Sequence, residues 1–360
     1  MVLHLKQILI ILLSIFTINL SEASSSVDEV TSIENSYFEG RSIDEIYHAG
    51  RQLYATYNDR ESLRYLLYSA QNGNGNAAYY YAIALKNTKH LKHDAEEIKK
   101  YMLIAAKQEV KEAVRYFALR MNELPSREAK EWREKYFQNI TELNESQPAQ
   151  AELEFYLYYY DSNKKLSNMH LNKAIELKNP IALMLRADRI KNGKRFFLFR
   201  QKKFMSLYRA AAKSNFIPAI RRYISILNRY NLKEESFDWS LKAAALGDLT
   251  SIAVVARMYG GFSKAYTSKN IDLVSAKLYY DIYLENAGRD QFNKLYEELA
   301  EEQSKIKANM SKEDLKKAAL GKSDLLLSIQ GNFTGDTSWT DNLYFYSYLL
   351  NDQSEFHVTQ

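Results

Sequence analysis

The stretch that decides the fold runs Ala70-Gln-Asn-Gly73-Asn-Gly-Asn-Ala77-Ala-Tyr-Tyr-Tyr81-Ala-Ile-Ala-Leu85. A glycine stands three residues after Ala70, a small residue follows four later, and bulky apolar residues follow at two further steps of four. Apolar residues at steps of three and four lie on one face of an α-helix. Glycine is typical of the turn just past a helix end. The stretch therefore predicts the end of one helix, a tight turn and the start of a second helix.

The same skeleton recurs along the chain. The small residue at its centre is Ala77 in this stretch, and further copies centre on Ala113, Ala219 and Ser251. Weaker copies centre on Ala151, Ala182, Phe292 and Leu325. The mean spacing is about 35 residues, which is typical of stacked helical hairpins. The small central residues are expected where paired helices approach closely, since alanine allows short interaxial distances.

Glycine occupies four of the expected turns, at Gly73, Gly247, Gly288 and Gly321. It adopts positive φ without a Cβ clash, so each is expected just past the end of a first helix. Asn215 is the usual second choice for that conformation. The corresponding residues Glu109, Gln147 and Lys178 depart from the pattern, which predicts turns of another type there.

Polar residues mark several expected helix starts. Asp94 stands where an N-cap belongs, ahead of an apolar stripe. Ser42-x-x-Glu45 and Ser311-x-x-Asp314 have the form of capping boxes that open helices.

The skeleton resembles the Sel-one-like repeat, a relative of the tetratricopeptide repeat, over about residues 59–325. The resemblance is strongest around 61–87, 94–121, 196–230 and 235–260. It implies an all-α, right-handed superhelical solenoid of antiparallel helix hairpins that binds other proteins, usually without catalysis. We expect the solenoid over 59–330, after a leading segment over 24–58 with a helix from Ser42 to Tyr57. A loop and a capping helix near Trp339 to Leu350 are expected over 331–360.

The first 23 residues have the plan of a secretory signal peptide. Ile8 to Leu20 is almost wholly apolar, and Ser21 and Ala23 are the small residues that precede a cleavage site. The apolar run is shorter than the roughly 20 residues of a membrane span. We therefore expect a mature chain that starts at Ser24 and has no stable membrane span; an uncleaved anchor remains the alternative. The chain has no cysteine, which favours a periplasmic or secreted bacterial protein over a disulfide-rich eukaryotic one.

Catalytic motifs are absent from the sequence. It has no phosphate-binding glycine loop, no strand-elbow serine and no His-Glu-x-x-His helix. His90 and His93 beside Asp94 could hold zinc with a further ligand, but a solvated loop capped by Asp94 accounts for the same residues. We expect no catalytic residue, no metal and no cofactor, and a protein that is not an enzyme.

Positive charge gathers in one segment. Residues 186–229 hold thirteen basic residues and one acid, a local net charge of +12 in a chain of net charge +5. Aromatic residues stand among these cations, a combination that suits an acidic protein partner. The candidate binding residues are Arg195, Phe196, Phe197, Arg200, Lys202, Lys203, Arg209, Arg221 and Arg222. Alternatively, the cations surround a solvated face and the phenylalanines seal neighbouring repeats.

Nucleic acid is a poor partner for an exported chain, whereas binding to anionic lipid headgroups is a further alternative for these cations. Runs of tyrosine at 79–81, 158–160 and 279–280 also predict some exposed rings, because consecutive helical residues lie about 100° apart. In the alternative, these rings cover the seams between repeats.

The sequence thus favours an exported scaffold or adaptor that binds an acidic macromolecule in the cell envelope. An immunity protein that neutralises a secreted toxic effector, for example a lipase, is the alternative, and an enzyme that acts on cell wall or lipid is less favoured.

Overall fold

The computed structural model describes residues 37–88, 94–119, 125–193, 197–263 and 271–335. The expected signal peptide, the Ser24 start and the helix near Trp339 to Leu350 lie outside these ranges, as do His90 and His93. The chain divides into two units, Met1–Ile46 and Tyr47–Gln360.

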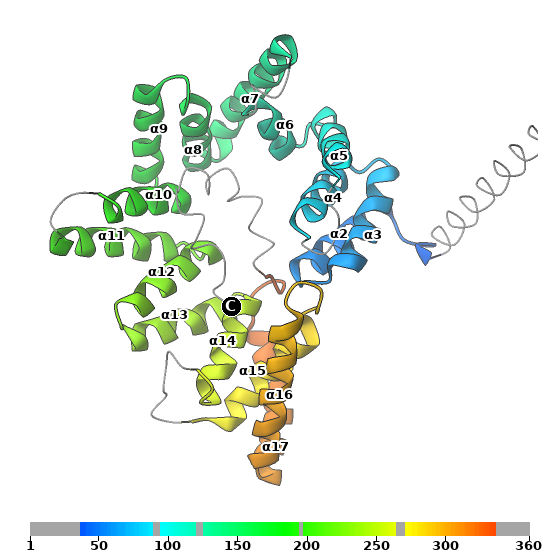
Figure 1. The fold of residues 1–360 in the computed structure, drawn as a ribbon, viewed down its shortest axis with the longest axis vertical. Coiled ribbons are helices and arrows are strands. Elements are labelled where there is room, and N and C mark those ends of the chain that lie inside the picture. Colours follow the sequence, from blue (N-terminus) through cyan, green and yellow to red (C-terminus); the bar gives the residue numbers. More distant parts are fainter. Residues whose placement is uncertain (1–36, 89–93, 120–124, 194–196, 264–270, 336–360) are drawn as a thin grey trace, which may run out of the picture. The chain divides into compact units, whose positions relative to one another are not determined.

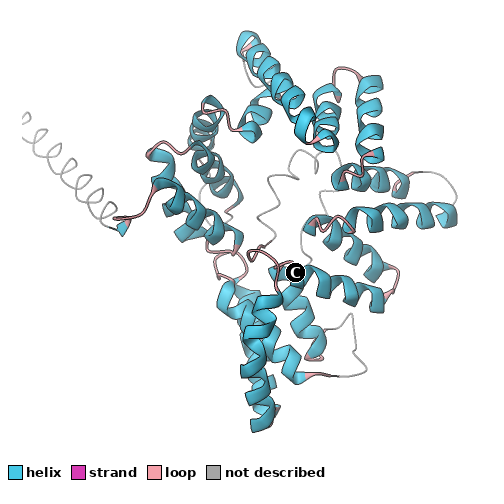
Figure 2. Cartoon of the chain, turned by 180° about the vertical axis from the view of Figure 1, so that it is seen from behind, coloured by secondary structure: helices cyan, strands magenta, loops and turns pink. Residues whose placement is uncertain are grey.

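The described residues form helices joined by short turns, and no β-strand occurs among them (Figures 1 and 2). In chain order the helices are α2 (Ile43–Ala55), α3 (Asp59–Gln71), α4 (Gly75–Asn87), α5 (Ala95–Lys107), α6 (Lys111–Ala118), α7 (Ser126–Ser146), α8 (Pro148–Tyr159), α9 (Lys164–Glu176), α10 (Pro180–Lys191), α11 (Phe197–Ala212), α12 (Ile217–Arg229), α13 (Lys233–Ala245), α14 (Leu249–Tyr259), α15 (Leu273–Asn286), α16 (Asn293–Asn309) and α17 (Lys312–Ser328). From α3 to α16 each helix packs on the next in sequence, and α17 packs on α15. The prediction of an all-α array of hairpins is confirmed for these residues.

In the unit Met1–Ile46, the described residues include the start of α2. Ser42 and Glu45 form the predicted capping box: Ser42 N donates to Glu45 Oε2 at 2.7 Å and Glu45 N donates to Ser42 Oγ at 3.2 Å. The expected helix from Ser42 to Tyr57 is thus observed as α2, and these hydrogen bonds lower the pKa of Glu45.

The two other helix starts that the sequence predicts, in the unit Tyr47–Gln360, also have side-chain caps. Asp94 accepts from the Glu96 and Glu97 amides at the start of α5. Ser311 accepts from the Asp314 amide at the start of α17.

The turns inside the hairpins up to α14 share one backbone geometry, except at Gln147, where φ is −137° and the turn is of another type, as predicted. Gly73 and Gly247 have φ of 94° and 84°, as predicted. Glu109 and Lys178 also have positive φ, 65° and 60°, so the prediction of another turn type at these two residues is wrong. Val110 N donates to Ala105 O at 3.1 Å, as Asp248 N does to Ala243 O beside Gly247. These bonds satisfy the last helical carbonyls and offset the cost of a side chain at positive φ, about 1–2 kcal/mol.

Gly288 lies just past the end of α15, as predicted, but without positive φ. The prediction at Gly321 is wrong because the repeat register changes after α15, and this residue lies inside α17. Helices α16 and α17 span 17 residues each, against 13 for α13, so a fixed spacing places their turns incorrectly.

The small central residues lie in the interior, as predicted. Ala77, Ala113, Ala182 and Ala219 are fully buried, and Ser251 is 4% exposed. They belong to helices α4, α6, α10, α12 and α14, the second helices of five hairpins.

Enlarging these residues is expected to overpack the hairpins. Ala219→Leu or Ala113→Leu should cost roughly 1–3 kcal/mol of unfolding free energy, because a fully buried Cβ leaves no space for three further carbons. Ala210→Leu on the exposed face of α11 is the matched control and should change little. Thermal unfolding by circular dichroism measures the difference; equal melting of all three variants and the parent would refute this packing.

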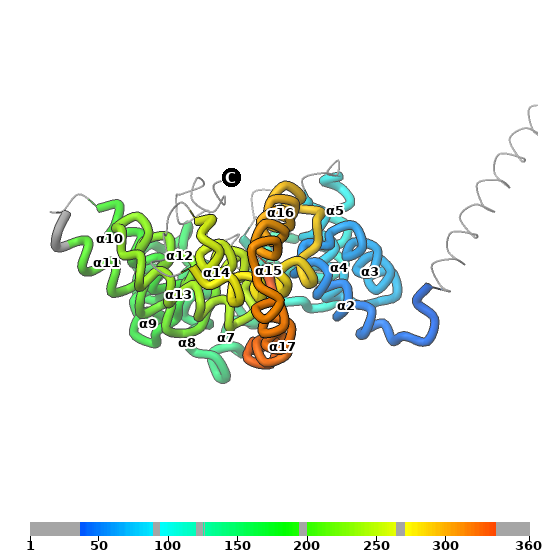
Figure 3. The backbone as a smooth tube through the Cα atoms, turned by 90° about the horizontal axis from the view of Figure 1, so that it is seen from below, coloured from blue at the N-terminus to red at the C-terminus, as the bar shows by residue number. Residues whose placement is uncertain are grey.

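The first and last hairpins of the unit Tyr47–Gln360 are in contact. Gly288 N donates to Thr56 O at 2.6 Å, and Asp290 N donates to Tyr57 O at 3.2 Å. Figures 1 and 3 show the loop between α15 and α16 beside α3. A Cβ on Gly288 would meet Tyr57 O at 2.5 Å, so glycine is required here for close approach rather than for a turn.

The segment 332–335 extends this contact. We call this segment and Tyr57 together the clasp. Gly335 N donates to Ala55 O at 2.6 Å, while Thr334 N donates to Gly247 O and Leu249 N to Thr334 O, both at 2.9 Å. Tyr57 is 2% exposed, and its ring meets that of Phe292 edge-on with centroids 4.9 Å apart. Residues from the first hairpin, the α13–α14 turn and the C-terminal segment therefore meet in one place.

Candidate partner-binding site

Six of the nine candidate binding residues have side chains that the structure describes. Arg195 and Phe196 lie outside the described residues, and Phe197 begins α11 with a side chain that is not described. No contact is therefore assigned to these three residues.

Helix α11 presents cations along its exposed face. Lys202, Lys203 and Arg209 are exposed, and so is Lys213 just beyond the helix end. Positions 202, 209 and 213 follow the steps of one helix face. Among the described residues, Lys202, Lys203 and Lys213 have no ion-pair partner. We call Lys202, Lys203, Arg209 and Lys213 the α11 basic face.

Arg209 shares its charge with an acid of the next hairpin. Its guanidinium contacts Glu235 and donates from Nε to Tyr223 Oη at 2.8 Å, while Tyr223 Oη donates to Glu235 Oε1 at 2.8 Å. Burial raises the pKa of Tyr223, and the Glu235 carboxylate adds to the rise, to about 12. Burial would raise the pKa of Glu235, but the hydrogen bonds from Tyr223 and Arg209 outweigh it and lower that pKa.

Arg200 holds the connection between α10 and α11. It is half-buried, and its Nη1 donates to the carbonyl oxygens of Lys191, at 3.0 Å, and of Gly193. Its guanidinium is thus directed at the main chain rather than at the exposed face.

Arg222 lies inside the protein, so it is not the exposed binding residue that the sequence predicted. Its Nη2 lies 2.8 Å from Asp188 Oδ1, and both side chains are 6% exposed. Tyr208 also donates to Asp188. Burial would lower the pKa of Arg222, but the Asp188 carboxylate reverses the shift and raises it. Burial and Asp188 both raise the pKa of Tyr208.

Arg221 is likewise directed inward, toward the clasp. Its Nε and Nη2 donate to the two carboxylate oxygens of Asp248, which is fully buried and caps α14 by accepting from Ser251 N at 2.9 Å. Burial would lower the pKa of Arg221, and Asp248 more than offsets that effect. Of the candidate binding residues with described side chains, Lys202, Lys203 and Arg209 are therefore the exposed ones, because acids from other repeats pair with Arg221 and Arg222 of α12.

The tyrosine runs lie in the seams between helices, so the expectation of exposed rings is wrong for them. Tyr79, Tyr81 and Tyr280 are buried, and the other members of the three runs are half-buried. Their rings meet neighbours of adjacent helices; Tyr81, for example, packs edge-on against Tyr101 with centroids 4.7 Å apart.

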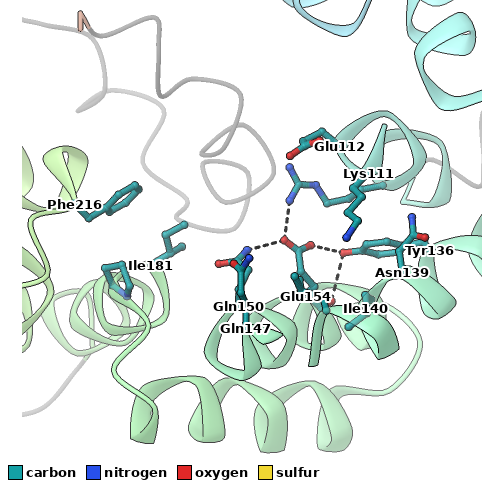
Figure 4. A pocket seen from close by; sticks show the side chains of 13 residues that line it. Lys111, Glu112, Tyr136, Asn139, Ile140, Gln147, Gln150, Glu154, Ile181 and Phe216 are labelled. Carbon is teal, nitrogen blue, oxygen red and sulfur yellow. Dashed lines mark hydrogen bonds and ion pairs between the residues drawn. The ribbon is translucent and has the colours of Figure 1, made fainter. Parts of the chain in front are cut away.

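The structure also contains a pocket of about 420 Å³ that the sequence did not predict. Helices α6, α7, α8 and α10 and the residue before α12 contribute its walls (Figure 4). The lining residues are Lys111, Glu112, Arg115, Tyr136, Asn139, Ile140, Leu143, Gln147, Gln150, Glu154, Pro180, Ile181 and Phe216.

Glu154 is at the centre of a hydrogen-bond network in this pocket. It accepts from Arg115 Nη1 and Gln150 Nε2 at 2.8 Å and from Tyr136 Oη at 2.6 Å. The side chains of Arg115 and Glu154 are 7% and 8% exposed. An acid among the buried residues of α8 was the sequence signal for this network. Its ion-pair partner could not be identified because Arg115 comes from α6, in the preceding hairpin.

Neither a metal site nor a membrane-spanning helix is found in the described part of the chain. No group of three histidine or acidic side chains there could hold a metal ion. No helix there is long and apolar enough to cross a membrane.

Comparison with known proteins finds similarity in structure only. No protein-family model and no curated protein matches the sequence. A protective antigen of uropathogenic Escherichia coli that displays an SLR fold is similar over 87% of this chain and 70% of its own, with 16% identity and a TM-score of 0.38. A Sel1 repeat protein from Oxalobacter formigenes is similar over 83% of this chain and 90% of its own, with 18% identity and a TM-score of 0.35. Both scores lie below 0.5, so the repeat architecture rests on the helices and turns of this chain itself.

Proposed function

We propose that this chain is a protein-binding scaffold whose α11 basic face meets an acidic surface on its partner. Among the described residues, Lys202, Lys203 and Lys213 are exposed and form no ion pair, whereas Arg209, Arg221 and Arg222 are each paired. Exposed like charges on one helix face raise the rate of association with an oppositely charged surface. This contrast within one segment supports the proposal, which assigns the chain binding and no catalysis.

The proposal places the protein in the periplasm or outside the cell. Its support is the apolar run from Ile8 to Leu20, which is followed by the small residues Ser21 and Ala23. Cell fractionation of a Gram-negative host that expresses the full chain should recover it outside the cytoplasm with Ser24 as its first residue. Recovery of the full-length chain in the membrane fraction would instead support an uncleaved anchor.

Site-specific photo-crosslinking in cells tests which surface is used. A photoreactive residue at Lys202 or Lys203 should form an adduct with an acidic protein. The matched positions are Lys164 and Lys165, an exposed lysine pair in the first turn of α9. The same adducts from both helices, or none from α11, would refute the proposed face. Mass spectrometry of the adduct separates an envelope scaffold from an immunity protein, since the latter requires a toxic effector as the partner.

A further inference from the structure

The pocket beside Glu154 has a floor that is already hydrogen-bonded. The Glu154 carboxylate accepts from three side chains, and the charge of Arg115 compensates it at 2.8 Å. A buried ion pair with several hydrogen bonds holds its members in a fixed geometry. The floor is therefore preorganised and carries no net charge.

The rest of the lining is also neutral in sum but rich in hydrogen-bonding groups. Lys111 and Glu112 cancel at the rim, and Asn139, Gln147 and Gln150 contribute side-chain amides. Asn139 Nδ2 is buried and has no hydrogen-bond partner among the described residues. A buried donor without a partner is unfavourable, so this atom is suited to an incoming acceptor such as a carbonyl oxygen.

The opposite wall is apolar. Figure 4 shows Ile181 and Phe216 on one side of the pocket, across from Asn139 and Lys111. A volume of about 420 Å³ lies within the usual range of binding pockets, about 300–1,000 Å³. An ion of either sign would meet a like charge at the rim and in the floor, whereas a peptide unit would meet amides and apolar side chains.

We propose that this pocket binds an uncharged segment of the partner's polypeptide chain, with a carbonyl oxygen that accepts from Asn139 Nδ2. The inference rests on the proposed function and adds to it a second contact, distinct in chemistry from the α11 basic face. Charge on α11 then governs the encounter, and the pocket selects a short uncharged stretch of the partner.

Methyl NMR of the purified chain, labelled at the isoleucine methyl groups, tests the pocket directly. The probe is N-acetyl-glutamine methylamide, a capped residue with main-chain and side-chain carbonyls. Titration should shift the signals of Ile140 and Ile181, which line the pocket, and leave Ile226 and Ile282 in the buried clusters unchanged. Absence of saturable shifts at Ile140 and Ile181 would overturn the proposal. Tighter binding of N-acetyl-glutamate methylamide, or of a monosaccharide, would also overturn it.

Two substitutions of Asn139 remove the donor. Asn139→Leu and the nearly isosteric Asn139→Asp should each weaken probe binding by about 2- to 10-fold, the range for one lost hydrogen bond. Asn144→Leu is the matched control, because it makes the same change at an exposed position of α7 outside the pocket. Equal affinity of the two Asn139 variants and the control would contradict the role of Nδ2.

Failure of the pocket can be told apart from failure of the basic face. Lys202→Glu with Lys203→Glu should leave the probe titration unchanged, because these lysines do not line the pocket. A parallel loss of probe binding would show that the two contacts are one site, which contradicts the inference.

Discussion

Asp188→Ala is expected to lower the free energy of unfolding by about 3–5 kcal/mol. The substitution leaves Arg222 as a buried cation without its carboxylate, and removing one partner of a buried ion pair has a cost of this size. It also removes the acceptor of Tyr208. Urea unfolding followed by circular dichroism measures the loss as a lower transition midpoint.

Asp238→Ala is the matched control for that experiment. Asp238 is exposed on α13, the helix that follows the one carrying Arg222, so its loss should change the free energy by no more than about 0.5 kcal/mol. If Asp188→Ala and Asp238→Ala unfold at the same urea concentration, Arg222 is not buried as described.

Tyr57→Ala is expected to lower the free energy of unfolding by a similar amount, about 3–5 kcal/mol. It removes a buried aromatic ring from the clasp and leaves a cavity. The Tyr57 ring packs against Phe292, and a Cβ on Gly335 would collide with the Tyr57 ring. The substitution should therefore also free the segment 332–335. Hydrogen exchange at the Gly335 and Gly288 amides reports whether the first and last hairpins separate.

Tyr57→Phe separates ring packing from the hydroxyl group. The hydroxyl lies 3.4 Å from Thr250 Oγ1 and interacts with the Arg221 guanidinium, so its loss should cost about 1–3 kcal/mol, less than the loss of the ring. Fast exchange of both amides in the parent chain would refute the clasp. A loss in Tyr57→Phe as large as in Tyr57→Ala would show that the hydroxyl, and not the ring, holds it together.

The hairpins up to α14 could be predicted because local rules determine them. Gly73 and Ala77 specify a turn and a close helix contact within one stretch of sequence, and both are as predicted. The prediction is wrong at Gly321, where a helix of 17 residues replaces the shorter helices of the repeat. Glu109 shows a further limit: two backbone hydrogen bonds hold a turn that its side chain does not favour.

The site was less predictable because its charges are paired between repeats. Arg221 and Lys203 are both basic residues of the segment 186–229, and the sequence does not distinguish them. In the structure, Arg221 contacts the buried Asp248 and Lys203 is exposed. Only the stacking of hairpins brings such partners together. The clasp and the Glu154 network escaped prediction for the same reason, since no local pattern connects Tyr57 with Gly335 or Glu154 with Arg115.

The most direct test of the central claim measures how fast the partner identified by crosslinking associates with two variants of this chain. Each variant carries two charge reversals. Lys202→Glu with Lys203→Glu changes the α11 basic face, and Lys164→Glu with Lys165→Glu makes the same change in net charge on α9. At 0.01 M salt, where the Debye length is about 30 Å, the α11 variant should associate roughly 10-fold more slowly than the α9 variant. The difference should shrink as salt rises. Equal association rates of the two variants across the salt series would contradict the claim that the partner meets this face.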